Sequence, residues 1–385
     1  MKKKVALLGA SGSIGKSTLD VLRRGVDHFD PVLFTAHRNK EMLLTLKKEF
    51  PAARTALTSP DARPSDGIDF TGEQDLLEAI AVSQADITVN GICGAAGLLP
   101  SQAALQAGSD LALANKETIV MAGELIFDLA RRKNARIIPV DSEHSAIFKL
   151  IEAHGSEAIH EIILTASGGP FRTYTAEDLA TVTLEQALNH PTWKMGPKIT
   201  VDSATLANKG LEVIEAAGLF GLSPEQIKIV IHPQSIVHSM VRLKDGAVYA
   251  QLSKPDMRLP IHEALYWPET SPSPFGALDF SALTLTFEAC DFKRFPMPAL
   301  AYGALRGGGF LPAVYNAANE TAVAAFFEGL VTFLEIPHIV GYVIEEFRLQ
   351  AAKAGKIDMT IETIRKQDIE ARTISERIIR ELYAV

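Results

Sequence analysis

Residues 4–24 read KVALLGASGSIGKSTLDVLRR and decide the fold class. A short apolar strand over 4–8 runs into a turn that contains Gly9, Gly12 and Gly15, and an amphipathic helix follows. Glycines let the backbone approach a phosphate, and the helix N-terminus adds unpaired N–H groups and a partial positive charge. The stretch therefore predicts the phosphate-binding βαβ unit of a dinucleotide-binding fold.

A second interpretation of the same glycines is a nucleoside-triphosphate loop. ASGSIGKS at 10–17 differs by one residue from the pattern G-x-x-x-x-G-K-[ST], because Ala10 stands at the first position. That loop needs φ values that glycine adopts easily. A kinase or ATPase therefore remains only as a disfavoured alternative.

The chain then alternates between short apolar runs and helical periods, which predicts a mostly parallel, doubly wound sheet. Expected strands lie at 31–36, 55–57, 87–89, 110–113 and 137–140, and expected helices lie at 40–50, 73–82 and 119–132. Arg38 follows the second strand, where a basic residue accommodates the extra phosphate of NADP and an acidic one would indicate NAD. The alternative for Arg38 is an ordinary surface arginine.

Bulk composition excludes several classes of protein. A chain of 385 residues predicts two or three domains, and 47% hydrophobic with 22% charged residues is typical of a soluble globular protein. A formal charge of −8 argues against a nucleic-acid surface. No apolar run is long enough for a membrane span or a signal peptide. Two cysteines fit a reducing cytoplasm.

The stretch IIPVDSEHSAIF at 137–148 predicts a metal site. Asp141 and Glu143 follow a buried strand, and residues two apart in an extended segment point the same way. Two carboxylates at the mouth of a strand suit magnesium or manganese. A solvated loop start is the alternative. If Ser142 also contacts a ligand, the chain must leave strand geometry at about Asp141.

A second polar cluster lies in KITVDSATLANKGLEVIEAAGLF at 198–220. We expect a strand at 199–201 and then a helix capped by Asp202 or Ser203. Asn208, Lys209 and Glu212 share one face of that helix. They form either a solvated stripe with an ion pair, or a phosphate site with a third metal ligand.

The sequence predicts fewer details for the other segments. LNHPTWKMGPK at 188–198 predicts a lid, with a loop packed on the core as the alternative. The runs 227–241 and 247–252 are β-rich, and a helix ends near Trp267. A segment rich in Pro and Ser follows over 268–276, and helical periods at 313–329, 337–349 and 360–384 close the chain.

Eight stretches in order make the whole chain resemble the 1-deoxy-D-xylulose 5-phosphate reductoisomerase family. They are GASGSIGKSTLDVLR, LANKE, PVDSEHSAIF, TASGGPF, HPTWKMGPKITVDSATLANKGLE, IHPQSIVHSMV, PDMRLPI and YNAANETAVAAF. The resemblance implies an α/β protein with an N-terminal Rossmann-like doubly wound parallel sheet, a central α/β catalytic domain and a C-terminal helical bundle. The implied segments are 1–141 for NADPH, 142–267 for catalysis, metal and dimerisation, 268–297 as a linker and 298–385 as the helical domain.

The resemblance also implies roles for single residues. NADPH would contact Gly9, Ser11, Gly12, Ser13, Ile14, Arg38, Asn39, Asn115, Lys116, Glu117, Gly196 and Met257. A divalent cation, Mg²⁺, Mn²⁺ or Co²⁺, would be held by Asp141, Glu143 and Glu212, which with Lys209 form the catalytic set. Substrate would contact Ser142, Ser167, His190, Trp193, Met195, Ser203, Asn208 and Lys209. Ser11 stands where Thr is common in the family, and His37 where a small or amide residue is more usual.

The implied activity is rearrangement of 1-deoxy-D-xylulose 5-phosphate, followed by reduction with NADPH to 2-C-methyl-D-erythritol 4-phosphate. A cytoplasmic homodimer without nucleic-acid or membrane partners is expected. A metal-independent NADP dehydrogenase of another small phosphorylated substrate remains the alternative, because it would explain the first 120 residues equally well. It would leave the three acidic residues without a role.

Overall fold

The computed structural model describes residues 1–63, 67–275, 278–351 and 357–382. The chain forms two compact units. Unit 1 holds the described residues of 1–118, 124–145 and 256–276, and unit 2 holds those of 119–123, 146–255 and 277–385. Each unit has its own sheet.

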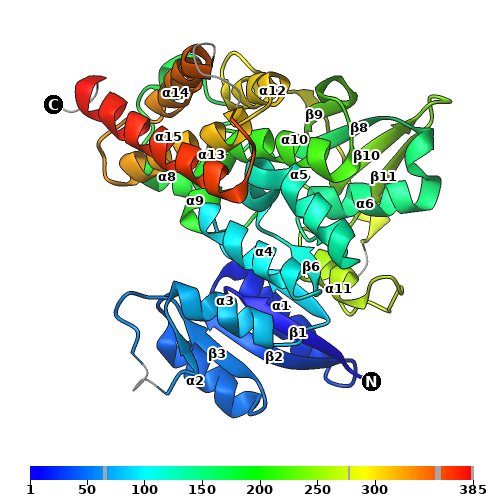
Figure 1. Cartoon of the computed structure of the whole chain (residues 1–385). Coiled ribbons are helices and arrows are strands. Elements are labelled where there is room, and N and C mark those ends of the chain that lie inside the picture. The colour runs from blue at the N-terminus through cyan, green and yellow to red at the C-terminus, as the bar shows by residue number, and fades with distance from the viewer. Residues whose placement is uncertain (64–66, 276–277, 352–356, 383–385) are drawn as a thin grey trace. The chain divides into compact units, whose positions relative to one another are not determined.

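The sheet of unit 1 has seven strands in the order β4-β3-β2-β1-β5-β6-β7, and every neighbouring pair is parallel. Figure 1 shows β1, β2 and β3 of this sheet side by side. Apart from the added strand β4, this order is that of the doubly wound dinucleotide-binding fold, which confirms the prediction. The strands are β1 Lys3–Leu8, β2 Phe29–Ala36, β3 Arg54–Leu57, β4 Phe70–Thr71, β5 Ile87–Asn90, β6 Asp110–Leu113 and β7 Ile137–Pro139.

Helices α1 to α5 connect these strands, α11 from later in the chain packs against α1, and α3 packs against α4. They are α1 Ser13–Arg24, α2 Lys40–Glu49, α3 Glu73–Val82, η2 Ala95–Gly97, α4 Leu98–Gln106, α5 Lys116–Lys133 and α11 Arg258–Tyr266. Close contact between β1 and α1 depends on Gly15, since a Cβ there would lie 2.4 Å from the carbonyl oxygens of Gly9 and Ala10. The third glycine of the turn therefore lets the helix start against the strand.

Unit 2 contains a mixed sheet in the order β11-β10-β8-β9-β12. Strands β8 and β9 are parallel, and the other neighbours are antiparallel. The strands are β8 Ile159–Ala166, β9 Ile227–Ile231, β10 Val237–Leu243, β11 Val248–Leu252 and β12 Glu288–Ala289. Strand β12 lies inside the segment expected to be a linker.

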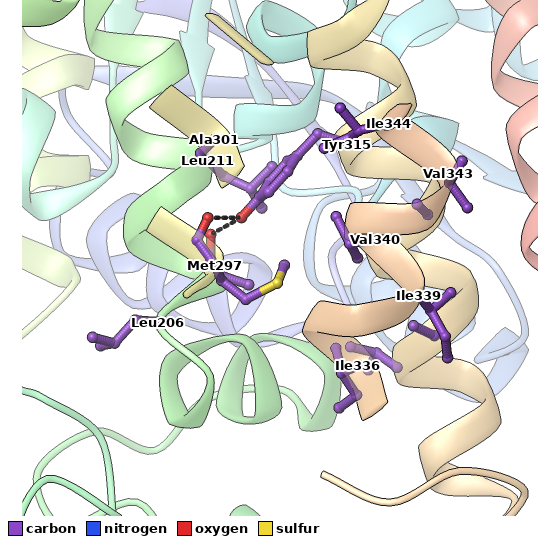
Figure 2. Close-up of a cluster of buried hydrophobic side chains, with 14 of the residues drawn as sticks. Leu206, Leu211, Met297, Ala301, Tyr315, Ile336, Ile339, Val340, Val343 and Ile344 are labelled. Atoms are coloured by element: carbon purple, nitrogen blue, oxygen red, sulfur yellow. Dashed lines mark hydrogen bonds between the residues drawn. The ribbon is translucent and has the colours of Figure 1, made fainter. Parts of the chain in front are cut away.

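Most helices of unit 2 contribute to one large hydrophobic core. Tyr315 at its centre is fully buried, and its hydroxyl donates to the carbonyl oxygens of Ala207 and Met297 (Figure 2). The C-terminal helices thus pack directly on α9 and α10. The helices are α6 Ser142–His154, which begins in unit 1, η3 Ser156–Ala158, α7 Ala176–Leu179, α8 Leu184–Leu188, α9 Pro197–Ala204, α10 Ala207–Phe220, η4 Pro224–Gln226, η5 Phe280–Ala282, α12 Met297–Gly307, α13 Leu311–Phe327, α14 Glu335–Ala351 and α15 Ile361–Leu382.

The strand predicted at 199–201 is wrong, because these residues lie inside helix α9. Ile199, Thr200 and Val201 are β-branched, which favours a strand locally. Pro197 at the first helical position starts a helix instead, and burial of Val201 in the core of unit 2 stabilises it. Tertiary packing overrides the local propensity.

The units do not follow the expected segment boundaries. Residues 256–275 return to unit 1 after β11, and the chain then re-enters unit 2, where β12 adds the last strand of its sheet. Phe275 lies under the guanidinium of Arg258 at 4.8 Å, so the first part of the expected linker packs on unit 1. These contacts do not test the expected division of the chain into four functional segments, which stays a prediction.

Candidate functional site

The carboxyl edge of the unit 1 sheet carries the candidate cofactor residues. The turn Gly9–Gly12 joins β1 to α1, and β1 neighbours β5 at the point where the strand order reverses. Gly12 is the N-cap of α1 and has no side chain to cap it. The first-turn N–H groups of α1 can therefore bind a phosphate. Ser13 is exposed and Ser11 half-buried beside them.

The end of β2 carries the residues that would distinguish NADP from NAD. His37, Arg38 and Asn39 are all exposed. Asn39 caps α2 by accepting the backbone N–H of Met42 at 3.1 Å, and His37 Nδ1 lies 3.0 Å from the hydroxyl of Thr58. Arg38 therefore projects from a turn that its two neighbours hold in place.

The motif Asn115-Lys116-Glu117 is buried at the end of β6. The Asn115 side-chain amide donates to the carbonyl oxygens of Ile92 and Gly94 at 2.8 and 2.9 Å, and its oxygen caps α5 by accepting from Thr118. The side chain of Asn115 thus shapes the loop that follows β5. The glycines of GICGAAG at 91–97 indicate this loop in the sequence.

Asp141 and Glu143 lie together at the end of β7, also in unit 1. Carboxylate oxygens of the two residues lie within 4.8 Å of each other. Asp141 accepts the backbone N–H of Glu143 at 3.2 Å, so it acts as the N-cap of α6. The Lys116 ammonium lies 2.9 Å from Asp141. The predicted convergence therefore arises at a helix start and not from strand alternation.

Ser142 occupies the first position of α6 and is buried. Its hydroxyl donates to the carboxylate of Glu143. The expectation that the chain leaves strand geometry at about Asp141 is confirmed, since β7 ends at Pro139 and α6 begins at Ser142.

In unit 2, Asn208, Lys209 and Glu212 cluster at the start of α10. Glu212 is completely buried and accepts from the Asn208 amide at 2.6 Å and from the Lys209 ammonium at 2.5 Å. The predicted shared face is confirmed by these two contacts. Lys209 is itself buried, so the pair is not a solvated surface stripe. Leu206, in the left-handed region at φ 61°, sets the corner between α9 and α10.

Ser167 and His190 meet in the same unit. Ser167 follows β8, and its hydroxyl lies 3.0 Å from His190 Nε2. His190 Nδ1 accepts the backbone N–H groups of Thr192 and Trp193 at 3.1 and 2.9 Å. Because N–H groups only donate, the neutral ring carries its proton on Nε2 and donates it to Ser167. His190 thereby fixes the first turn of residues 189–196, the lid loop.

This arrangement predicts a pH dependence of folding stability. Burial lowers the pKa of His190 below its ordinary value. The unfolded chain therefore binds more protons than the folded chain between the lowered pKa and about pH 6.5. We expect the free energy of unfolding to decrease as the pH falls through this interval and then to level off. Urea unfolding across pH should show this slope in the natural protein and not in His190→Asn. Equal slopes in both would contradict the expectation.

Ser203 lies near the end of α9, beside the turn that carries Ser167. Gly169 has φ +68°, and a Cβ on it would lie 2.6 Å from the carbonyl oxygen of Ser203. The glycine lets the Ser167 turn contact the backbone of α9 directly. Unit 2 thus gathers the candidate phosphate-binding residues on two touching segments.

The remaining predicted residues divide between the units. Met257 is the N-cap of α11 in unit 1. Trp193, Met195 and Gly196 lie in the lid loop, where the Trp193 ring is 6.3 Å from His238. Asp141 and Glu143 belong to unit 1 and Glu212 to unit 2, so joint binding of one metal by all three stays a prediction.

A dinucleotide-binding sheet with acidic residues at its carboxyl edge, and a second unit with buried phosphate-type donors, together define a class of nucleotide-dependent enzymes. Family models assign the chain more closely. The model described as 1-deoxy-D-xylulose 5-phosphate reductoisomerase matches residues 5–123, that of its C-terminal domain matches 137–220, and that of the DXP reductoisomerase C-terminal domain matches 252–374.

Two curated relatives are 1-deoxy-D-xylulose 5-phosphate reductoisomerases. That of Chlorobaculum tepidum is 47% identical, over 98% of this chain and 100% of its own. That of Laribacter hongkongensis is 45% identical, over 96% and 97%. The chain belongs to the 1-deoxy-D-xylulose 5-phosphate reductoisomerase family.

Solved structures of the family have the same fold. The reductoisomerase from Zymomonas mobilis in complex with NADPH is 40% identical with a TM-score of 0.90, covering 99% of both chains. A DOX-P reductoisomerase in complex with NADPH, fosmidomycin and magnesium is 37% identical with a TM-score of 0.93, also over 99% of both. Among the described residues, no helix combines the length and apolar character needed to cross a membrane.

Proposed function

We propose that this chain rearranges 1-deoxy-D-xylulose 5-phosphate and reduces the product with NADPH to 2-C-methyl-D-erythritol 4-phosphate, a step of non-mevalonate isoprenoid biosynthesis. The activity depends on NADPH and on a divalent cation. One observation carries the proposal above the others. Glu212 is completely buried and accepts hydrogen bonds from Lys209 and Asn208. A candidate metal ligand therefore lies next to two side chains that can donate hydrogen bonds to a phosphate.

NADPH fits the carboxyl edge of the unit 1 sheet. The uncapped N-terminus of α1 would bind the pyrophosphate, and exposed Arg38 would pair with the additional ribose phosphate. Asn115, whose buried side chain also shapes the loop after β5, would contact NADPH as well. The remaining proposed contacts are Gly9, Ser11, Gly12, Ser13, Ile14, Asn39, Lys116, Glu117, Gly196 and Met257.

The proposed metal ligands are Asp141, Glu143 and Glu212. Their carboxylates are the hard oxygen donors that Mg²⁺, Mn²⁺ and Co²⁺ accept. Bound there, the cation would supply Lewis-acid polarisation of the substrate's ketone. Lys116 at 2.9 Å from Asp141 would hold that carboxylate in place and offset its negative charge.

The substrate's phosphate would bind at the Ser167 turn and at the α9–α10 corner of unit 2. Lys209 would offset its charge, and Asn208, Ser203, Ser167 and His190 would donate hydrogen bonds. Ser142 would contact the sugar part. Trp193 and Met195 of the lid loop would then exclude water from the reactive carbonyl. Binding of the remote phosphate would orient the carbon skeleton.

The test is NADPH oxidation with 1-deoxy-D-xylulose 5-phosphate. We expect EDTA to abolish the activity and added Mn²⁺ to restore it, with 2-C-methyl-D-erythritol 4-phosphate as the product. An absorbance assay at the NADPH band and mass spectrometry of the product measure both. Activity that survives EDTA would instead favour the metal-independent NADP dehydrogenase.

Two further features are part of the proposal. A homodimer is supported by the edge strand β11, whose Val248 and Tyr249 are 48% and 42% exposed and suit pairing with a second copy. A cytoplasmic location is supported by the cysteine content, since two cysteines are too few for a disulfide framework.

A further inference from the structure

Helix α13 of unit 2 carries buried polar side chains on the face that contacts α9 and α10. Tyr315 and Asn319 are four residues apart, so they share this face. Tyr315 donates to the carbonyl oxygen of Ala207 at the start of α10 (Figure 2). A Cβ on Gly210 would lie 2.4 Å from the Tyr315 hydroxyl, so α10 approaches α13 as closely as glycine allows.

Asn319 holds the neighbouring helix through a single buried carboxylate. Its side-chain amide donates to Asp202 Oδ1 at 2.8 Å, and both residues are at most 1% exposed. The second oxygen of Asp202 accepts the Lys198 ammonium at 3.0 Å. Asp202 is therefore satisfied from two sides, by α13 and by the first turn of its own helix.

The amide of Asn319 serves the contact with Asp202. A carboxylate only accepts hydrogen bonds, so the NH2 group of the Asn319 amide is the end that faces Asp202. Among the described residues, the Asn319 side-chain oxygen has no hydrogen-bond partner although it is buried. A leucine would fill the same space without this unsatisfied oxygen, so an amide here is explained by the hydrogen bond that it donates.

What Asn319 holds is the segment that bears the proposed phosphate ligands. Helix α9 has eight residues and would not be stable alone, so its packing fixes its position. The lid loop enters it at Pro197, Lys198 lies in its first turn, and Ser203 follows Asp202 directly. A shift of α9 would move the base of the lid loop and the Ser203 hydroxyl together.

We propose that Asn319 is a positioning residue for substrate binding, which holds α9 through Asp202 so that Ser203 and the base of the lid loop meet the substrate's phosphate. The inference rests on the proposed function, because it assumes that α9 binds this phosphate. Asn319 touches neither substrate nor cofactor in this role. Its loss therefore affects the geometry of binding and not the chemical groups.

The experiment compares Asn319→Leu with the natural protein in full steady-state kinetics. We expect the KM for 1-deoxy-D-xylulose 5-phosphate to rise about tenfold or more, since small displacements of binding groups have large effects. The kcat should stay within about threefold, and the KM for NADPH should rise much less than the KM for the substrate, because Gly196 is the one proposed NADPH contact that adjoins α9. A general loss of folded protein would lower the apparent kcat and leave both KM values unchanged.

Asn316→Leu is the matched control. Asn316 is a completely buried amide on the same helix, and it donates to Glu320 within α13. Its replacement should leave the substrate KM within about threefold of the natural value. An equal rise of KM in both variants would overturn the proposal, and so would an unchanged KM in Asn319→Leu.

A reciprocal exchange covers the case in which Asn319→Leu fails to fold. Asp202→Asn alone loses the carboxylate that accepts from both sides, and Asn319→Asp alone places two carboxylates face to face. The double variant restores one amide-to-carboxylate hydrogen bond, with Lys198 still facing an oxygen. We expect the double variant to recover a substrate KM below that of either single variant, and no recovery would overturn the proposal. A natural protein that does not turn over this substrate would overturn the proposed function first, and the inference with it.

Discussion

Replacing Glu212 by Gln is expected to lower turnover of 1-deoxy-D-xylulose 5-phosphate by at least about a hundredfold, while the Kd for NADPH stays within about twofold. Glutamine keeps the size of the side chain but removes the charge that a divalent cation requires. All proposed NADPH contacts except Gly196 lie in unit 1, whereas Glu212 lies on α10 of unit 2. Turnover and binding should therefore separate.

The same substitution also affects the folded protein, and this effect has to be measured apart. Lys209 is buried and lies 2.5 Å from the Glu212 carboxylate. A neutral amide in its place leaves a buried ammonium without its counter-charge, which destabilises the fold. Urea unfolding of the variant measures this loss. Turnover of the two proteins is then measured without urea and expressed per mole of folded enzyme.

Asp368→Asn provides the control for loss of a buried, ion-paired carboxylate. Asp368 lies on α15 and pairs with Arg372 at 2.8 Å. It should lose stability but keep turnover within about threefold and keep Mn²⁺ binding. Isothermal titration with Mn²⁺ should detect a weaker site in Glu212→Gln alone. Near-normal turnover or unchanged Mn²⁺ affinity in that variant would exclude Glu212 as a ligand.

The sequence predicted unit 1 well because each pattern that indicates one of its strands, turns or helices lies within a short segment. The strand, glycine turn and helix at 4–24 and the alternating pattern after it led to the observed parallel sheet. The Asn208, Lys209 and Glu212 cluster was predictable for the same reason, since Glu212 lies four and three residues after the other two, which places all three on one face of a helix.

The errors occur where distant segments decide the structure. Residues 199–201 have strand propensity but form α9, because Val201 is buried in a core to which the C-terminal helices contribute. The return of 256–275 to unit 1 depends on contacts such as that of Arg258 with Asp20 at 2.7 Å, 238 residues away. Likewise, nothing near Asn319 in the sequence indicates Asp202. A single amino-acid sequence does not show which distant residues contact each other in the fold.

Arg38→Asp is expected to raise the KM for NADPH at least about tenfold while the KM for NADH changes less than about threefold. Arg38 follows β2 and is exposed, in a turn fixed by the Asn39 cap and by the contact of His37 with Thr58. The turn should survive the substitution because Arg38 is not among the groups that hold it. The substitution would therefore weaken the binding of NADPH without disturbing the fold.

The two cofactors differ by one phosphate, so the ratio of their KM values isolates the contact of Arg38 with that group. Arg38→Gln removes the attraction without adding repulsion, and it should give a smaller rise for NADPH than Arg38→Asp. Added salt should reduce the preference of the natural protein for NADPH, since an exposed charge pair is screened. If both cofactors weaken equally in Arg38→Asp, the residue supports the turn and does not read the phosphate. Selectivity for NADPH would then have to come from another group at the end of β2, where His37 is the adjacent candidate.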